Sequence, residues 1–250
     1  MKQKTALFIK EFKVMSRLYA IPLIIMIGLL IFDSFYTFSR MDGQILHFTR
    51  SQTIFLNFFF VISRILAGGL LIYALSVERK TGTLYQNMSM PCRRYETVSY
   101  KYLVAVLYCL VFSFGQTIMY YLQVREGELA RGRDISQIGL EFLIFLDHFS
   151  FMFMVTGMAC LIWGIISAIR KLPVFIGTSS VFIIATFMVW FKENLLPLLN
   201  LANHVRFRMI GSGYNSYKIQ MRHFNASYYL AIGLVFAAAG LYIYNRFSEV

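Results

Sequence analysis

The chain has 250 residues, of which 58% are hydrophobic and 14% charged, and its mean hydropathy is +0.61. This composition is too apolar for a soluble domain of such length, so it predicts a membrane protein. The formal charge of +12 would suit a nucleic-acid-binding protein, but the basic residues cluster at the ends of apolar runs. The composition therefore favours a lipid membrane as the partner and argues against nucleic acid.

Four large apolar residues recur at helical spacing before the first long apolar run, and three basic residues occupy the opposite face. They are Phe8, Phe12, Met15 and Tyr19 on one side and Lys10, Lys13 and Arg17 on the other. The pattern is typical of an amphipathic helix in the membrane surface, so we expect residues 1–17 to form an N-terminal interfacial helix. An ordinary cytoplasmic cap, whose lysines only set topology, is the alternative.

Apolar runs long enough to cross a bilayer recur along the chain. A transmembrane helix needs about 20 predominantly apolar residues. The candidate spans are Leu18–Phe38, Ile54–Val77, Tyr102–Val124, Phe149–Ile169, Leu172–Phe191 and Tyr228–Tyr244. We therefore predict an all-α polytopic membrane protein with six transmembrane helices, in a single membrane domain over residues 1–250.

Basic residues predict the direction in which the chain crosses the membrane. If the spans alternate, most of the flanking basic groups fall on one side. These are the N-terminal lysines, Arg79, Lys80, Arg93, Arg94, Arg170, Lys171 and Arg246. By the positive-inside rule that side is the cytoplasm, so both termini are expected there. The stretch 192–227 then lies outside, although it is itself basic.

Two features of the C-terminal third leave alternatives open. The segment Leu195–Ala202 contains Pro197 and is apolar but too short to cross. It is either a re-entrant or interfacial helix at the outer leaflet or a plain surface loop. In the last span, Gly233, Ala237 and Gly240 form a small-residue stripe that lets another helix approach closely. That helix belongs either to this chain or to a second subunit.

Arg64 lies near the middle of the second span, where a charge is costly unless it is paired or hydrated. Asp33 and Asp147 are its candidate partners. The pair is interpreted either as a structural contact that fixes helix register, which is the commoner device, or as a charge that lines a substrate route. His148 has no second histidine at helical spacing, so we interpret it as an interfacial residue rather than part of a proton relay.

Several catalytic patterns are missing from the sequence. It contains no G-x-x-x-x-G-K-[ST] phosphate loop, no H-E-x-x-H metal helix and no G-x-S-x-G nucleophile elbow. These absences argue against a self-contained ATPase, metalloprotease or lipase. We expect no catalytic residues, no metal site and no cofactor in this chain. An intramembrane enzyme with an unfamiliar site is the alternative.

Residues 78–101, between the second and third spans, read E-R-K-T-G-T-L-Y-Q-N-M-S-M-P-C-R-R-Y-E-T-V-S-Y-K. Gly82 can end the helix that leaves the membrane, because glycine accepts a left-handed conformation. Thr83 and Gln86 have the spacing of a capping box, which starts a new helix. Pro91 ends that helix. The segment therefore predicts a short helix at the membrane surface, held between two membrane helices.

This segment resembles the loop between the second and third spans in permease subunits of type-2 ATP-binding-cassette exporters. The residues that carry the resemblance are Glu78, Gly82, Thr83, Leu84, Pro91, Arg94, Val98 and Lys101. They reproduce the family's acidic residue, its Gly-Thr-Leu, its proline, its basic residue and the lysine that opens the next span. Gln86 and Asn87 depart from the pattern, since the family usually has leucines there. The six spans, the amphipathic N-terminus and the short outer segment also fit.

The resemblance implies that residues 78–101 form a cytoplasmic coupling loop docked on a separate ATPase subunit, which binds ATP and Mg²⁺. The coupling residues that it implies are Glu78, Arg79, Gly82, Thr83, Leu84, Pro91 and Arg94. Such permeases work as dimers, so we expect two ATPase copies and a second permease subunit, either identical or a close relative.

The function that the resemblance implies is ATP-driven export of a hydrophobic or amphipathic substrate across the plasma or inner membrane. A lipophilic peptide or a drug is the first expectation, because the chain is small and has no large external domain. A glycolipid or polysaccharide exporter is the alternative within the family. Outside it, the alternative is a non-transporting membrane protein, such as an immunity or scaffold subunit.

Overall fold

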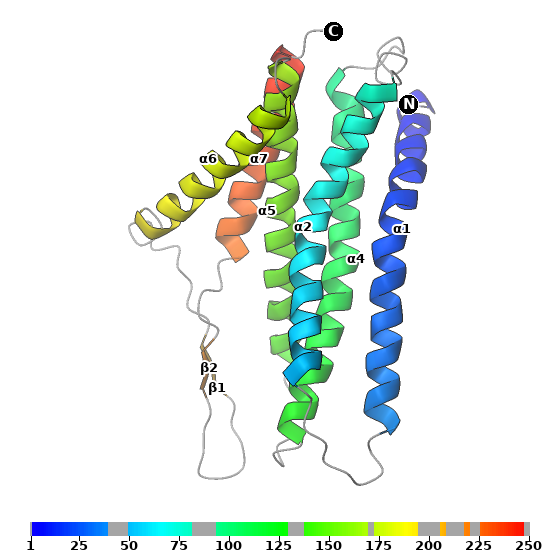
Figure 1. The fold of residues 1–250 in the computed structure, drawn as a ribbon, viewed down its shortest axis with the longest axis vertical. Helices are drawn as coiled ribbons and strands as arrows, with labels where there is room; N and C mark the ends of the chain where they lie inside the picture. Colours follow the sequence, from blue (N-terminus) through cyan, green and yellow to red (C-terminus); the bar gives the residue numbers. More distant parts are fainter. Residues whose placement is uncertain are drawn as a thin grey trace.

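A computed structural model describes residues 2–39, 50–81, 94–129, 138–169, 173–194, 206–208, 218–220 and 226–247. These residues are almost entirely helical (Figure 1). The helices are α1 (Lys2–Ser39), α2 (Arg50–Thr81), α4 (Arg94–Leu129), α5 (Ile138–Ala168), α6 (Pro173–Asn194) and α7 (Ala226–Phe247). Two short strands, β1 (Arg206–Arg208) and β2 (Lys218–Gln220), pair with each other.

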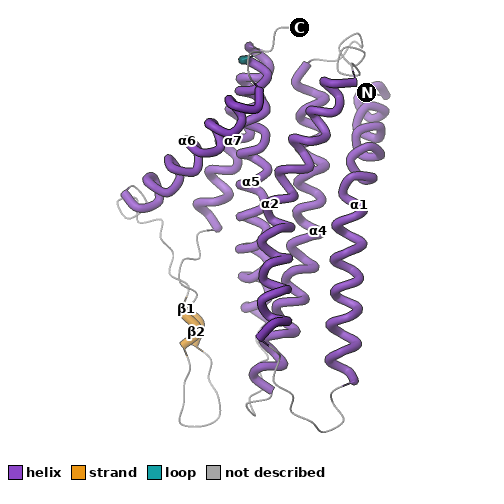
Figure 2. Tube along the Cα trace, viewed as in Figure 1, coloured by secondary structure: helices purple, strands orange, loops and turns teal. Residues whose placement is uncertain are grey.

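Five helices stand side by side as a bundle, and α6 leans away from it (Figure 2). In the bundle α1 packs mainly on α4, both α2 and α4 pack on α5, and α7 packs along α5. α6 contacts α5 and diverges from it towards its own C-terminal end. α5 is therefore the helix around which the rest of the bundle is arranged.

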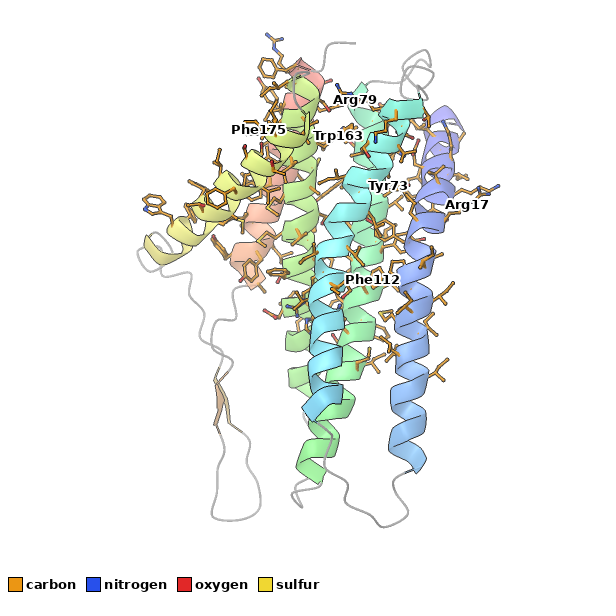
Figure 3. All side chains as sticks on the ribbon, viewed as in Figure 1. Arg17, Tyr73, Arg79, Phe112, Trp163 and Phe175 are labelled. Atoms are coloured by element: carbon orange, nitrogen blue, oxygen red, sulfur yellow. The ribbon has the colours of Figure 1, made fainter. Side chains whose placement is uncertain are left out.

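The buried core lies where α1, α2, α4 and α5 meet. Fully or almost fully buried apolar residues include Met15, Leu71, Phe112, Met152 and Trp163. Phe112 and Trp163 point into the bundle, whereas Phe175 of α6 points outward (Figure 3). Many outward-facing residues are also large and apolar, among them Ile24, Phe182 and Leu234. Helices that are apolar on both the inner and the outer face are expected in a membrane.

Among the described residues, five stretches are long and apolar enough to cross a bilayer. They are Lys4–Ile31, Val61–Thr81, Glu96–Met119, Phe145–Ala168 and Tyr228–Phe247. The prediction of a multi-pass helical membrane protein is therefore confirmed. The predicted fifth span forms α6, whose described apolar part, Phe175–Met188, is shorter than these five.

α1 is one continuous helix, so the prediction of a separate interfacial helix over residues 1–17 is wrong. At 1.5 Å per residue α1 is about 57 Å long, far more than the roughly 30 Å of the hydrocarbon core. The predicted amphipathicity is present in part: Met15 and Tyr19 are fully buried and Lys10 and Lys13 are exposed, but Phe12 is 43% exposed. The buried stripe packs against α4, and the helix continues through Pro22 without a break.

The helix ends that the sequence assigned to one side of the membrane do lie together. α1 begins, α2 ends, α4 begins, α5 ends and α7 ends at the same end of the bundle (Figure 1). The last turn of α2 carries Arg79 and Lys80, and that of α7 carries Arg246. We call this end of the bundle the basic end. The strands β1 and β2 lie far from it, past the opposite ends of α6 and α7.

The all-α prediction missed the two strands. They pair antiparallel, with Phe207 opposite Ile219 at the centre of the register. Each strand alternates polar, apolar and polar residues, but three residues are too few to distinguish a strand from a loop by periodicity. The predicted re-entrant segment Leu195–Ala202 lies outside the described residues.

α5 and α7 approach each other through glycines. Gly157 and Gly164 of α5 face Gly233 and Gly240 of α7 so closely that no Cβ fits at any of these four positions. A Cβ on Gly240 would lie 2.5 Å from the backbone carbonyl of Cys160. The glycines are spaced seven apart on both helices, which suits a left-handed crossing. The small-residue stripe of the last span therefore packs within the chain.

We predict that Gly240→Ala destabilises the protein and that Gly69→Ala does not. The added methyl group meets the α5 backbone at Gly240, whereas nothing lies within 4 Å of a Cβ on Gly69. Both substitutions gain helix propensity, so the difference between them isolates the packing cost, which is about 1–3 kcal/mol. Thermal unfolding of the detergent-purified variants measures it. Equal melting temperatures would contradict the packing described for α5 and α7.

Candidate functional site

Three charged side chains meet between α1, α2 and α4 at the basic end. Lys101 Nζ lies 3.0 Å from Glu78 Oε1 and forms a second ion pair with Glu11 Oε2. The side chains of Lys101 and Glu11 are fully buried, and that of Glu78 is 12% exposed. We call these three residues the ion cluster. It joins three helices through one ammonium group.

The periodicity of α1 and α4 explains why the charges meet. On α1, Leu7, Glu11, Met15 and Tyr19 are spaced by four and all are buried, so one stripe of the helix faces α4. On α4, Lys101 belongs to a buried stripe that includes Val98, Val104 and Ala105. Glu11 and Lys101 therefore each lie within a stripe of mostly apolar buried residues.

Burial makes the members of the ion cluster depend on one another. Removing a charge from water costs several kcal/mol, which a buried pair recovers only with good geometry and hydrogen bonds. Lysine has three donors and serves both carboxylates here. Glu11 Oε1 has no hydrogen-bond partner within the described part of the chain, so Lys101 is the main compensation for this carboxylate.

A second ion pair lies nearby between α1 and α4. Lys4 Nζ is 2.9 Å from Glu96 Oε1, with the lysine side chain 64% exposed and the glutamate 9% exposed. The exposed lysine gains little from this contact, because solvent screens the interaction. The ion cluster, and not this pair, therefore dominates the electrostatic contact between α1 and α4.

The structure joins the two ends of the segment that resembles a coupling loop. Glu78 and Lys101 are its first and last residues. Gly82, Thr83, Leu84 and Pro91 lie outside the described residues, and so does the side chain of Arg94, whose backbone begins α4.

The two candidate coupling residues at the end of α2 point in different directions. Arg79 is partly exposed in the last turn of α2 (Figure 3). Glu78 was predicted to contact an ATPase subunit, whereas its carboxylate binds Lys101 within the chain. Glu11 was missed. The available signal was an acidic residue at helical spacing from Leu7, Met15 and Tyr19.

Arg64 has a different partner from the two that the sequence suggested. Its Nη2 forms a hydrogen bond with Nδ1 of His148, and its Cζ lies 5.4 Å from the ring centroid of Phe151. Asp147 acts on Arg64 through its charge, and the side chain of Asp33 lies outside the described residues. His148 is only 6% exposed, so it is buried inside the bundle, and its contact with Arg64 was not predicted.

A second polar contact lies beside Arg64. Gln116 Nε2 on α4 donates a hydrogen bond to Oγ of Ser63, the residue before Arg64 on α2, and both side chains are buried. The nearby hydroxyls of Ser113 and Thr117 are satisfied within α4, by the carbonyl oxygens of Cys109 and Ser113 at 2.7 Å. Gln116 was not predicted as a site residue, although its side chain is an amide within an apolar span. Ser63, Arg64, Gln116 and His148 form what we call the intramembrane polar site.

Within the described ranges, no group of three or more His, Cys, Asp or Glu side chains lies close enough together to hold a metal ion. No protein-family model, curated protein or solved structure matches the chain. The function must therefore be inferred from the residues and their geometry.

We predict that Lys101→Met lowers the free energy of unfolding by about 3–5 kcal/mol, because it leaves two buried carboxylates without their cation. The triple variant Glu11→Gln, Glu78→Gln, Lys101→Met should recover much of this loss. Lys4→Met is the matched control and should cost at most about 1 kcal/mol, because that pair is exposed at the lysine. Thermal unfolding in detergent measures all three variants. A Lys101→Met protein as stable as the Lys4→Met control would show that the ion cluster is dispensable.

Proposed function

We propose that the chain is the permease subunit of an ATP-binding-cassette exporter and moves a hydrophobic or amphipathic substrate out of the cell. A separate ATPase docked on residues 78–101 supplies the energy. The single observation that carries the proposal is the contact between the two ends of this segment, the 3.0 Å ion pair of Glu78 with Lys101.

A loop can transmit a displacement to the membrane helices only if its stems, the two helix ends that flank it, are held together. Glu78 lies at the end of α2, and Lys101 lies two turns into α4, so their ion pair clamps both stems. Glu11 adds α1 to the clamp. A force applied to the loop would therefore move three helices together, which is what a lever between an ATPase and a permease requires.

In this proposal the residues of the segment divide into a clamp and a contact surface. Glu78 belongs to the clamp. Arg79, partly exposed at the end of α2, and Arg94, at the start of α4, are placed to make charge-assisted hydrogen bonds with the ATPase. Gly82 supplies the turn, and Thr83, Leu84 and Pro91 shape and bound the coupling helix.

The basic end then faces the cytoplasm of a plasma or inner membrane, which places both ends of the chain there. α6 has 22 residues, about 33 Å of helix, and we propose it as a sixth crossing. Residues 192–227, which include β1 and β2, become the outer segment, with Leu195–Ala202 re-entrant or interfacial. A second permease subunit and two ATPase copies complete the transporter.

Lipophilic peptides or drugs are the proposed substrates, and a glycolipid or polysaccharide is the alternative. The effect on ATP turnover distinguishes a transporter from a non-transporting immunity or scaffold protein. A transporter alters the turnover of its bound ATPase, whereas a scaffold protein has no need to do so.

We predict that Gly82→Pro abolishes coupling. In co-expression with an ATPase from a neighbouring reading frame, the wild-type chain should retain the ATPase on an affinity column and change its ATP turnover. Gly82→Pro should lower retention by about tenfold, because proline cannot adopt a left-handed turn. Arg206→Ala in β1, far from the basic end, is the control and should behave as wild type.

Thermal stability separates loss of coupling from loss of folding. Gly82→Pro should unfold at the wild-type temperature, because the clamp does not include Gly82. Unchanged ATPase retention and turnover with Gly82→Pro would refute the assignment of the loop. A wild-type chain that neither retains an ATPase nor changes its turnover would favour the scaffold function.

A further inference from the structure

We propose that the intramembrane polar site binds the acidic group of an amphipathic molecule, a carboxylate or phosphate attached to an apolar tail. Arg64 supplies the charge, His148 positions it, and Gln116 offers an acceptor beside it. If the chain is the exporter proposed above, on which this step rests, the bound molecule is its substrate.

The site lies within the membrane-spanning part of the bundle, towards the end opposite the ion cluster. Arg64 is separated from Glu78 by about 21 Å along α2, and Gln116 is separated from Lys101 by about 22 Å along α4, at 1.5 Å per residue. Arg64, Gln116 and His148 each lie three residues inside the end of an apolar span, so the site is within the roughly 30 Å hydrocarbon core, nearer to the surface opposite the ion cluster. A charged side chain at such depth is rare, and its usual explanation is a functional partner.

The groups in direct contact with Arg64 are neutral. Arginine stays protonated and can only donate, so Nδ1 of His148 must accept, and His148 is neutral with its proton on Nε2. The ring of Phe151 is also neutral. Asp147 acts on the guanidinium through space, and no described carboxylate is hydrogen-bonded to it. The guanidinium is therefore held in place by neutral groups.

Two buried polar atoms, one on Arg64 and one on Gln116, have no hydrogen-bond partner among the residues that the structure describes. They are Nε of Arg64, a donor, and Oε1 of Gln116, an acceptor on a fully buried side chain. Buried polar groups are almost always hydrogen-bonded, so such atoms need an explanation. Nε–H is one arm of the fork with which arginine holds a carboxylate or phosphate. A hydroxyl or amide next to the acid would satisfy Gln116.

An apolar tail also has a place beside the site. Arg64 is itself half-buried, and its neighbours Val61 and Ile65 on α2 are 53% and 61% exposed. These side chains face outward from the bundle and are apolar, as surfaces in contact with lipid are. A molecule can therefore approach from the bilayer with its tail along α2 and its acidic group at Arg64.

A purely structural role explains the site less well. A contact needed only to join α2 to α5 does not require a guanidinium, and it leaves the Arg64 Nε–H and the Gln116 oxygen unused. An acidic group satisfies the charge and the donor together. Two sources share this chemistry, an anionic membrane lipid and a transported amphipathic acid.

The test uses the full-length chain in nanodiscs of phosphatidylcholine. Binding of pyrene-labelled dodecanoate is followed by energy transfer from the tryptophans and compared with binding of pyrene-labelled dodecanol, which is neutral. We expect the wild-type chain to bind the acid about tenfold more tightly. Arg64→Met should abolish this preference. Arg246→Met, which removes an exposed positive charge at the end of α7, should keep it.

Two results would overturn the site: equal affinity of the wild-type chain for acid and alcohol, or an undiminished preference in Arg64→Met. If Arg64→Met does not fold, the wild-type comparison and Arg64→Gln decide, and Arg64→Gln, which keeps an N–H donor but removes the charge, should also lose the preference for the acid. Nanodiscs that contain phosphatidylglycerol distinguish the source. Displacement of the acid by this lipid assigns the site to membrane lipid and refutes the substrate assignment, whereas retention supports a substrate.

The experiment needs no ATPase, so its failure differs from failure of the exporter proposal. A chain that prefers the acid but retains no ATPase has the site without the exporter function. A chain that couples to an ATPase but does not discriminate acid from alcohol is an exporter without this site.

Discussion

The ammonium group of Lys101 is the contact on which the arrangement of α1, α2 and α4 depends. It lies between two carboxylates, and both Lys101 and Glu11 are fully buried. A slip of one residue would rotate a helix by about 100° and turn its charged residue away from the others. Buried charges left apart are strongly unfavourable. The ion cluster therefore fixes the register of three helices that apolar packing alone would leave less well specified.

The other half of the bundle, α5 and α7, is held together by close packing. α5 and α7 meet through paired glycines, where backbones approach too closely for any Cβ. The bundle thus has two parts, a charge-linked group of α1, α2 and α4 and a close-packed pair of α5 and α7. The hydrogen bond from Arg64 to His148 crosses the boundary between these parts, since it joins α2 to α5. The intramembrane polar site therefore lies at one of the contacts between the two parts.

The sequence predicted what depends on local composition and missed what depends on packing between helices. Hydropathy and length located the five spanning helices, and the cost of a buried charge singled out Arg64. Glu11 was missed because a single acidic residue among lysines reads as part of a solvated surface until α4 is known to cover it. The contact of His148 was missed for the same reason, since its partner lies on another helix. The continuity of α1 was missed because amphipathicity does not distinguish a lipid surface from a neighbouring helix.

α2 and α4 connect the two sites. α2 carries Glu78 and Arg64, and α4 carries Lys101 and Gln116, with roughly 20 Å between the members of each pair. A helix is stiff over such a length, so displacement of its basic end also displaces its residues in the polar site. The chain has no phosphate-loop pattern of its own, so in the proposed exporter this displacement comes from an ATPase acting on residues 78–101. The ion cluster makes α2 and α4 move together, which preserves the contact of Ser63 with Gln116. The hydrogen bond from Arg64 to His148 is then the contact that changes, because His148 belongs to α5.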